Sequence, residues 1–179
     1  MKLTVFGATG GTGQQLVSQA LAAGCAVTAL VRHPALGKSQ SGLTFLSGDT
    51  HDSEAVGRAV AGNDAVLCAL GGRPWRRSEN VCSSAMPNII DAMHKHSVRR
   101  IIAISTFGAG DSRPQAPWLA RALIFGFILR TEVADKEAME AQLSSSGVDW
   151  TVVRVGVLAG EGTCSRGTAT LPHATSNQP

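Results

Sequence analysis

The sequence predicts an α/β protein built on a doubly wound parallel sheet, and three observations support this fold class. Short apolar runs alternate with helical patterns along most of the 179 residues. The runs are almost continuously apolar, as expected for strands that are covered on both faces. Most of the helical patterns stop at a glycine, which readily adopts the left-handed backbone that ends helices. This alternation is typical of doubly wound sheets.

The elements of the first half follow in order from these patterns. The strands are expected at residues 3–6 (LTVF), 26–31 (AVTALV) and 43–46 (LTFL), each a short apolar run. The helices are expected at residues 12–23 and 53–61, with Gly24 and Gly62 directly after them. Four glycines separate the first strand from the first helix, so the chain must turn tightly there.

The second half repeats the pattern. The strands are expected at residues 65–70 (AVLCAL), 101–104 (IIAI) and 150–155 (WTVVRV). The helices are expected at residues 81–94 and 133–145, the latter before Gly147. Residues 111–130 break the rhythm with a proline-containing loop and an apolar helix, which is either a wall of a substrate site or a core helix. We expect one domain over residues 1–160 and an irregular or disordered tail over residues 161–179.

The charges are distributed unevenly. The formal net charge is +3, and no acidic residue precedes Asp49, whereas Lys2, Arg32 and Lys38 do. The remaining basic and acidic residues balance. This distribution favours an anionic ligand near the first part of the chain and does not favour a nucleic-acid surface along the whole of it.

Membrane and metal functions have little support. The apolar run at 118–129 contains Arg121 and is far shorter than the roughly 20 residues that cross a bilayer. The four cysteines form neither a C-x-x-C pair nor a zinc-ligand pattern, so we expect reduced thiols. His94 and His96 are two residues apart and cannot face one ligand from a helix. We therefore expect no metal, no membrane association and a cytoplasmic location.

The glycine-rich stretch carries the clearest chemical signal. Gly7, Gly10, Gly11 and Gly13 lie between the first strand and the first helix. Glycines there let a pyrophosphate approach the backbone, and the N–H groups that begin the helix bind its charge. A strand before and a helix after make this a strong match to a dinucleotide-binding loop. A tight turn without a ligand is the alternative.

The end of the second predicted strand indicates which dinucleotide is bound. An acidic residue there would bind the ribose of NAD(H), but this chain has Arg32 followed by His33. An arginine can pair with a 2′-phosphate, so we expect NADP(H) to be preferred over NAD(H). A solvated surface arginine is the alternative.

Several motifs together resemble one protein group. They are GATGGTG, VRHP, SGDTHD, ALGG, ISTFGAGDS and ADKEAMEAQLSSSGVDWTVVRVG. They are similar to the atypical short-chain dehydrogenase/reductases. Within these, they most resemble the small NAD(P)H-binding group of NmrA-like proteins and the biliverdin reductase B type of flavin reductase. The similarity covers about residues 1–160 and implies a Rossmann fold with its cofactor at the carboxyl ends of the strands.

The resemblance also implies roles for single residues. It places Gly7, Thr9, Gly10, Thr12 and Gly13 around the pyrophosphate, with Gly11 beside Gly10, and Arg32 at the 2′-phosphate. It places Asp49 and Thr50 beside the adenine, and Leu70, Gly71, Gly72 and Arg73 on the ribose side. It places Ser105 and Thr106 near the nicotinamide, with Val155 and Gly156 closing over it.

The sequence departs from the wider superfamily at the catalytic tyrosine. It contains no tyrosine, and Glu132 stands four residues before Lys136, where the tyrosine is expected. A ketone reduction driven by tyrosine is therefore excluded. The resembling reductases deliver hydride to flavins or similar acceptors, with a proton from solvent or a nearby hydroxyl. Ser105 or Thr106 would then relay the proton and Lys136 would orient ribose hydroxyls; Lys136 as an exposed helix residue is the alternative.

Two further departures affect the substrate side. Val155 replaces a proline that the group usually carries, which changes the backbone over the nicotinamide. Members of the group also usually continue past this strand with a further strand and a helix that help to shape the substrate side. We expect an NADPH-dependent oxidoreductase of a small planar electron acceptor such as a flavin or quinone. The alternatives are an NADP(H)-binding regulator without catalysis and a truncated family member with little function.

Overall fold

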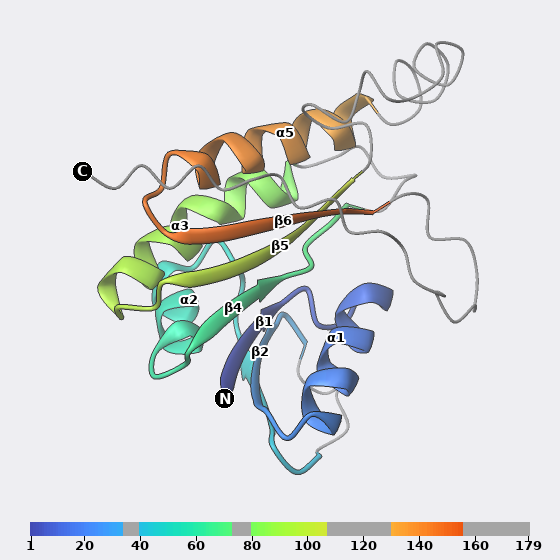
Figure 1. The fold of residues 1–179 in the computed structure, drawn as a ribbon, viewed down its shortest axis with the longest axis vertical. Coiled ribbons are helices and arrows are strands. Elements are labelled where there is room, and N and C mark those ends of the chain that lie inside the picture. The colour runs from blue at the N-terminus through green and yellow to red at the C-terminus, as the bar shows by residue number, and fades with distance from the viewer. Residues whose placement is uncertain (34–39, 73–79, 107–129, 156–179) are drawn as a thin grey trace.

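The predicted doubly wound sheet is confirmed in a computed structural model, which describes residues 1–33, 40–72, 80–106 and 130–155 (Figure 1). Six parallel strands form one sheet in the order β3-β2-β1-β4-β5-β6. The strands are β1 (Lys2–Phe6), β2 (Ala26–Val31), β3 (Leu43–Ser47), β4 (Ala65–Cys68), β5 (Arg100–Thr106) and β6 (Asp149–Val155). The described helices are α1 (Gly11–Ala22), α2 (Ser53–Val60), α3 (Val81–Lys95) and α5 (Arg130–Ser144).

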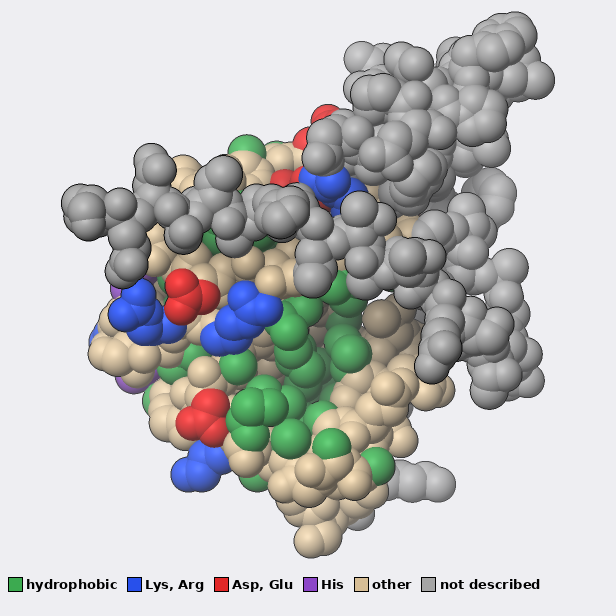
Figure 2. Space-filling view, in the orientation of Figure 1, with side chains coloured by type: hydrophobic (Ala, Val, Ile, Leu, Met, Phe, Trp, Pro, Cys, Tyr) green, Lys and Arg blue, Asp and Glu red, His purple; other side chains and the backbone are tan. Residues whose placement is uncertain are grey.

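Helices lie on both faces of the sheet. On one face α2, α3 and α5 pack side by side, and on the other α1 packs against β1 and β2 (Figure 1). Alternate residues of β1 to β4 supply the two cores. Phe6, Val66 and Ile101 belong to the larger core with α2, α3 and α5, whereas Val5 and Val27 belong to the smaller core with α1. In the view of Figure 2, hydrophobic side chains gather over the central strands beside α1.

The order of the strands fixes where ligands can bind. β1 and β4 are neighbours although β2, β3 and α2 lie between them in sequence. The chain therefore runs outward from β1 in one direction and then in the other. Ligands of open α/β sheets bind beyond the carboxyl ends of the strands at such a reversal. The glycine-rich stretch follows β1 at this point.

The predicted boundaries agree with the structure to within a few residues. β4 ends at Cys68 rather than at residue 70, and β5 extends to Thr106, so that Ser105 and Thr106 belong to the strand. α5 begins at Arg130, three residues before the predicted start at 133. The rest of the predicted segment 111–130 and the tail over 161–179 lie outside the described residues. No helix in the described ranges is long and apolar enough to cross a membrane.

Candidate functional site

The glycine-rich stretch is packed so tightly that two of its glycines cannot be replaced without a shift. Gly7 has a φ of +81°, and a Cβ there would lie 2.4 Å from the carbonyl oxygen of Ala69, just after β4. A Cβ at Gly13 would lie 2.0 Å from the carbonyl oxygen of Gly7. Real Cβ atoms do not approach backbone that closely. Gly7 and Gly13 therefore bring β1, β4 and α1 together at one point.

The other two glycines of the stretch, Gly10 and Gly11, are not crowded by neighbouring atoms. Gly10 is the N-cap of α1 in extended conformation, and it has no side chain that could cap the helix. Gly11, the first helical residue, is exposed, and a Cβ there would meet nothing within 4 Å. The first turn also carries no acidic residue. The N–H groups that begin α1 are thus accessible to an anion, as a bound pyrophosphate requires.

Arg32 follows β2 at the same edge of the sheet. It is exposed and forms no ion pair with any described residue. The end of β2 lies against the residues that follow β3, because the Gly48 N–H donates to the carbonyl of Val31 at 3.1 Å. The next residue is Asp49, and the charge of Arg32 contributes to lowering its pKa. Arg32 and Asp49 therefore lie in the same part of the site.

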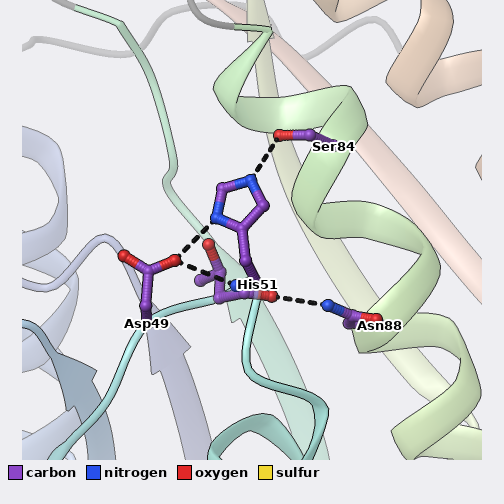
Figure 3. Close-up of polar contacts among 5 residues, drawn as sticks. Asp49, His51, Ser84 and Asn88 are labelled. Atoms are coloured by element: carbon purple, nitrogen blue, oxygen red, sulfur yellow. Dashed lines mark hydrogen bonds and ion pairs between the residues drawn. The ribbon is translucent and has the colours of Figure 1, made fainter.

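Residues 49–51 are tied to α3 by side-chain hydrogen bonds (Figure 3). Asp49 Oδ1 accepts the backbone N–H of His51 at 2.9 Å and contacts its ring Nδ1 at 2.6 Å. These two bonds lower the pKa of Asp49. His51 Nε2 lies 3.1 Å from Ser84 Oγ, and Asn88 Nδ2 donates to the carbonyl of Thr50 at 2.9 Å. The two predicted adenine-side residues, Asp49 and Thr50, are thereby fixed beside α3.

Lys136 is buried and hydrogen-bonded to the backbone of two neighbouring segments. It is only 4% exposed, so the alternative of an exposed helix lysine is wrong. Its Nζ donates to the carbonyl of Leu70 at 2.7 Å and to that of Ile104 at 2.8 Å. Lys136 therefore joins the carboxyl ends of β4 and β5 from α5. Its orienting of ribose hydroxyls stays a prediction.

The residue before Lys136 fixes the start of α3. Asp135 accepts the backbone N–H groups of Cys82 and Ser83 at 2.9 and 2.8 Å, and the Ser83 hydroxyl at 2.6 Å. Burial alone raises the pKa of Asp135, but the bonds from Ser83 and Cys82 outweigh burial and lower it. Cys82 lies beside Lys136 in the interior, and burial raises the pKa of its thiol to about 12. A thiol with that pKa is protonated and a poor nucleophile.

The two predicted nicotinamide-side hydroxyls differ in their surroundings. Ser105 is 1% exposed, and its Oγ donates to Glu140 Oε1 at 2.5 Å. Glu140 also pairs with Arg154 of β6, through Nε at 3.2 Å and Nη2 at 2.6 Å. Ser105 therefore lies in a polar cluster between the sheet and α5. Thr106, the last residue of β5, is only half-buried.

The described part of the predicted site lies along one edge of the sheet. The loop residues from Gly7 to Gly13 follow β1, Arg32 follows β2, Asp49 and Thr50 follow β3, Leu70, Gly71 and Gly72 follow β4, and Val155 ends β6. Arg73 and Gly156 lie outside the described residues. His51, Ser84, Asn88, Asp135 and Glu140 were missed as site residues, although His51 and Asp135 lie in the quoted motifs SGDTHD and ADK.

Metal and disulfide chemistry find no support in the described ranges. These ranges contain no group of His, Cys, Asp or Glu side chains that could hold a metal ion. Cys25, Cys68 and Cys82 are free thiols. The observed edge instead combines open backbone N–H groups, an exposed guanidinium and an ionised carboxylate, which suits a ligand that carries both phosphate and base.

Comparison with known proteins identifies the family to which this chain belongs. A family model described as NAD(P)H-binding matches residues 7–177. An uncharacterised chloroplastic protein of Arabidopsis thaliana is 32% identical over 173 residues, which cover 88% of this chain and 59% of that protein. The chain thus spans less than two thirds of the length of this curated relative.

Solved structures share the fold. ChuY of Escherichia coli O157:H7, described as an anaerobillin reductase, is 28% identical with a TM-score of 0.71, and the match covers 86% of this chain and 72% of ChuY. A short-chain dehydrogenase/reductase of Veillonella parvula, solved in complex with NADP, is 19% identical with a TM-score of 0.72 over 86% of this chain and 68% of that one. At 19% identity the second likeness shows the fold alone.

Proposed function

Because the chain belongs to the NAD(P)H-binding family, we propose that it is an oxidoreductase that binds NADPH along the carboxyl edge of the sheet and transfers hydride to a small planar acceptor. The observation that carries this proposal is the open start of α1. Gly10 and Gly11 leave the backbone N–H groups uncovered, while Gly7 and Gly13 hold the loop in place. A pyrophosphate bound there would lie between the cofactor's two halves.

Arg32 supports NADPH as the form bound. Its exposed guanidinium has no ion-pair partner in the described ranges and lies where the family fold presents the ribose of the adenosine. A guanidinium can form two parallel hydrogen bonds to the oxygens of a 2′-phosphate. NADH has only a hydroxyl there and would gain less from the interaction.

The acceptor is inferred from the groups available for proton transfer. The chain contains no tyrosine, and the hydroxyl of Ser105 already donates its hydrogen bond to Glu140. An acceptor that receives a hydride from the cofactor and takes its proton from solvent would not need a tyrosine or serine as proton donor. Flavins and quinones meet this requirement. The 28% identity with ChuY, an anaerobillin reductase, adds a tetrapyrrole to the acceptors to be tested.

The roles of the site residues follow from their positions. The loop from Gly7 to Gly13 would bind the pyrophosphate, Arg32 the 2′-phosphate, and Asp49 and Thr50 the adenine. Leu70, Gly71 and Gly72 would line the ribose, and Thr106 and Val155 would lie beside the nicotinamide. Lys136 would act through the backbone that it holds, since one of its carbonyl partners, Leu70, follows β4 and the other, Ile104, lies near the end of β5. The free thiols support a reducing compartment such as the cytoplasm.

Hydride transfer can be followed with labelled cofactor. NADPH deuterated on one or the other face of the nicotinamide is incubated with the protein and a flavin, a quinone or a linear tetrapyrrole, and the reduced acceptor is analysed by mass spectrometry. For the tetrapyrrole, whose new C–H bond does not exchange, we expect the label from only one face; for flavin and quinone, oxidation of the labelled cofactor is followed. No oxidation above the protein-free rate with any acceptor would exclude the enzymatic function.

A regulator that binds NADP(H) without turnover is the second candidate. The observation that favours it is that both Ser105 and Lys136 are already hydrogen-bonded within the protein. Such a regulator would bind cofactor with micromolar or better affinity and bind a partner protein differently with NADPH and NADP⁺. Measured turnover with any of the acceptors above would make this second function unnecessary.

A further inference from the structure

We propose that His51 is a positioning residue for the adenine end of the cofactor: it holds Asp49 so that the second carboxylate oxygen accepts the adenine amino group. The proposal rests on the proposed cofactor site, in which Asp49 binds the adenine. It adds His51 as the residue that orients the Asp49 carboxylate. Asp49 follows β3 at the carboxyl edge, and His51 links it to Ser84 of α3 (Figure 3).

The two oxygens of Asp49 are not equivalent. Oδ1 receives both the backbone N–H and the ring Nδ1–H of His51, at 2.9 and 2.6 Å. Oδ2 has no hydrogen-bond partner in the part of the chain that the structure describes, and it points away from His51 (Figure 3). An ionised carboxylate only accepts hydrogen bonds. Asp49 therefore offers one fixed acceptor, and an exocyclic amino group is the donor that an adenine presents.

The Asp49 carboxylate determines which ring nitrogen of His51 carries the proton, and Ser84 contacts the other nitrogen. Donation to a carboxylate requires the proton on Nδ1, which leaves Nε2 of the neutral ring as an acceptor. The Ser84 hydroxyl, 3.1 Å from Nε2, can supply the matching donor. The backbone N–H of Ser84 donates to the carbonyl of Asn80, the N-cap residue of α3, so it does not stabilise an oxyanion beside the hydroxyl. In the proposed cofactor site the Ser84–His51–Asp49 arrangement therefore orients the Asp49 carboxylate.

A second contact fixes the same segment. Asn88, one turn further along α3, donates to the carbonyl of Thr50 at 2.9 Å. The hydrogen bonds from His51 lower the pKa of Asp49 most and the charge of Arg32 adds to the effect, so the carboxylate is ionised beside the predicted 2′-phosphate site. The carboxylate that would accept the base and the guanidinium that would bind the phosphate therefore lie in the same part of the site.

The probe that isolates this role is a cofactor without the amino group. Deamino-NADPH has hypoxanthine in place of adenine, so it presents a carbonyl oxygen to Asp49 instead of a donor. The dissociation constants of NADPH and deamino-NADPH are measured by fluorescence titration for the wild type and four variants. The variants are His51→Phe, His51→Asn, Ser84→Ala and the control His94→Phe, an exposed histidine near the other end of α3.

The ratio of the two dissociation constants is the readout. Since a hydrogen bond to a charged group is worth roughly 1.5–3 kcal/mol, we expect the wild type to prefer NADPH by about tenfold or more. His51→Phe should bring the ratio close to one. His51→Asn, whose amide can replace the Nδ1 donor, should keep most of the preference, and Ser84→Ala should lower it by about threefold. His94→Phe should leave it unchanged.

The outcomes separate this inference from the proposed function. If the wild type binds both cofactors and His51→Phe keeps the full preference, the role of His51 is wrong and the cofactor site stands. The same follows if a folded wild type binds NADPH without any preference over the deamino form. If neither cofactor binds, the proposed function fails, and the role of His51 fails with it. Should His51→Phe not fold, an unchanged ratio in Ser84→Ala would contradict the orientation by Ser84.

Discussion

Asp135 Oδ2 accepts the backbone N–H of Cys82 at 2.9 Å, although 53 residues separate the two in sequence. The bond caps α3 from α5, because the side chain of Asn80, the N-cap residue of α3 with a left-handed backbone, makes no capping hydrogen bond. The next residue, Lys136, joins the ends of β4 and β5. Two consecutive residues of α5 thus hold three elements of the candidate site in place.

Removal of the Asp135 carboxylate should destabilise the protein. Asp135→Ala leaves the N–H groups of Cys82 and Ser83 without partners at a buried helix start. Loss of a helix cap costs up to about 2 kcal/mol, and we expect a loss of that size in chemical denaturation. Asp91→Ala, an exposed position on the same helix α3, is the control and should change stability little. Equal effects of the two substitutions would contradict the capping role.

The same carboxylate should give stability a defined pH dependence. The pKa of Asp135 is lower in the folded protein than its ordinary value of 3.8. Its stabilising contribution is therefore complete above that value and is lost as the pH falls through the folded pKa. We expect the stability difference between wild type and Asp135→Asn to be constant from pH 7 to 5 and to shrink below about pH 4. A difference that grows on acidification would contradict this sign.

Substitutions of two loop glycines should distinguish an effect on stability from an effect on cofactor binding. Gly13→Ala places a methyl group against the Gly7 carbonyl, and we expect at least about 2 kcal/mol of destabilisation. Gly11→Ala meets no neighbour, so its unfolding free energy should change by less than about 0.5 kcal/mol. Its NADPH affinity should nevertheless fall, because the methyl group lies where the pyrophosphate is proposed. Unchanged affinity in Gly11→Ala would argue against that position.

Lys136 should matter for stability whatever its catalytic contribution. Lys136→Met keeps most of the side-chain volume but leaves the carbonyls of Leu70 and Ile104 without this donor. We expect a loss of about 2–3 kcal/mol in urea denaturation. Lys95→Met, at the exposed end of α3, is the matched control. If both variants unfold at the same urea concentration as the wild type, Lys136 does not hold the two strands.

The sequence was sufficient for the parts of the fold that depend on local patterns. Apolar runs marked every strand, and the positive φ of Gly24, Gly62 and Gly147 agrees with their predicted place after helices. The tight turn between the first strand and the first helix also followed from the four glycines that separate them. These features need only the preferences of neighbouring residues, so they can be read without knowing the tertiary structure.

The contacts that shape the site could not be read in this way. Lys136 was located from its spacing to Glu132, but its partner Leu70 is 66 residues away. His51 meets Ser84 only because the chain crosses from β3 to α2 beside α3. The helix pattern of α3 likewise gives no sign that its cap comes from another helix. Each of these contacts depends on which strands become neighbours, and a local pattern does not contain that information.

The central claim is that NADPH binds at this edge with its 2′-phosphate on Arg32. The most direct measurement is a fluorescence titration of wild type and Arg32→Ala with NADPH and NADH. We expect the wild type to bind NADPH at least about tenfold more tightly than NADH, and Arg32→Ala to lose most of that preference with little change in NADH affinity. A wild type that binds neither cofactor, or an Arg32→Ala variant that loses affinity for both equally, would contradict the claim.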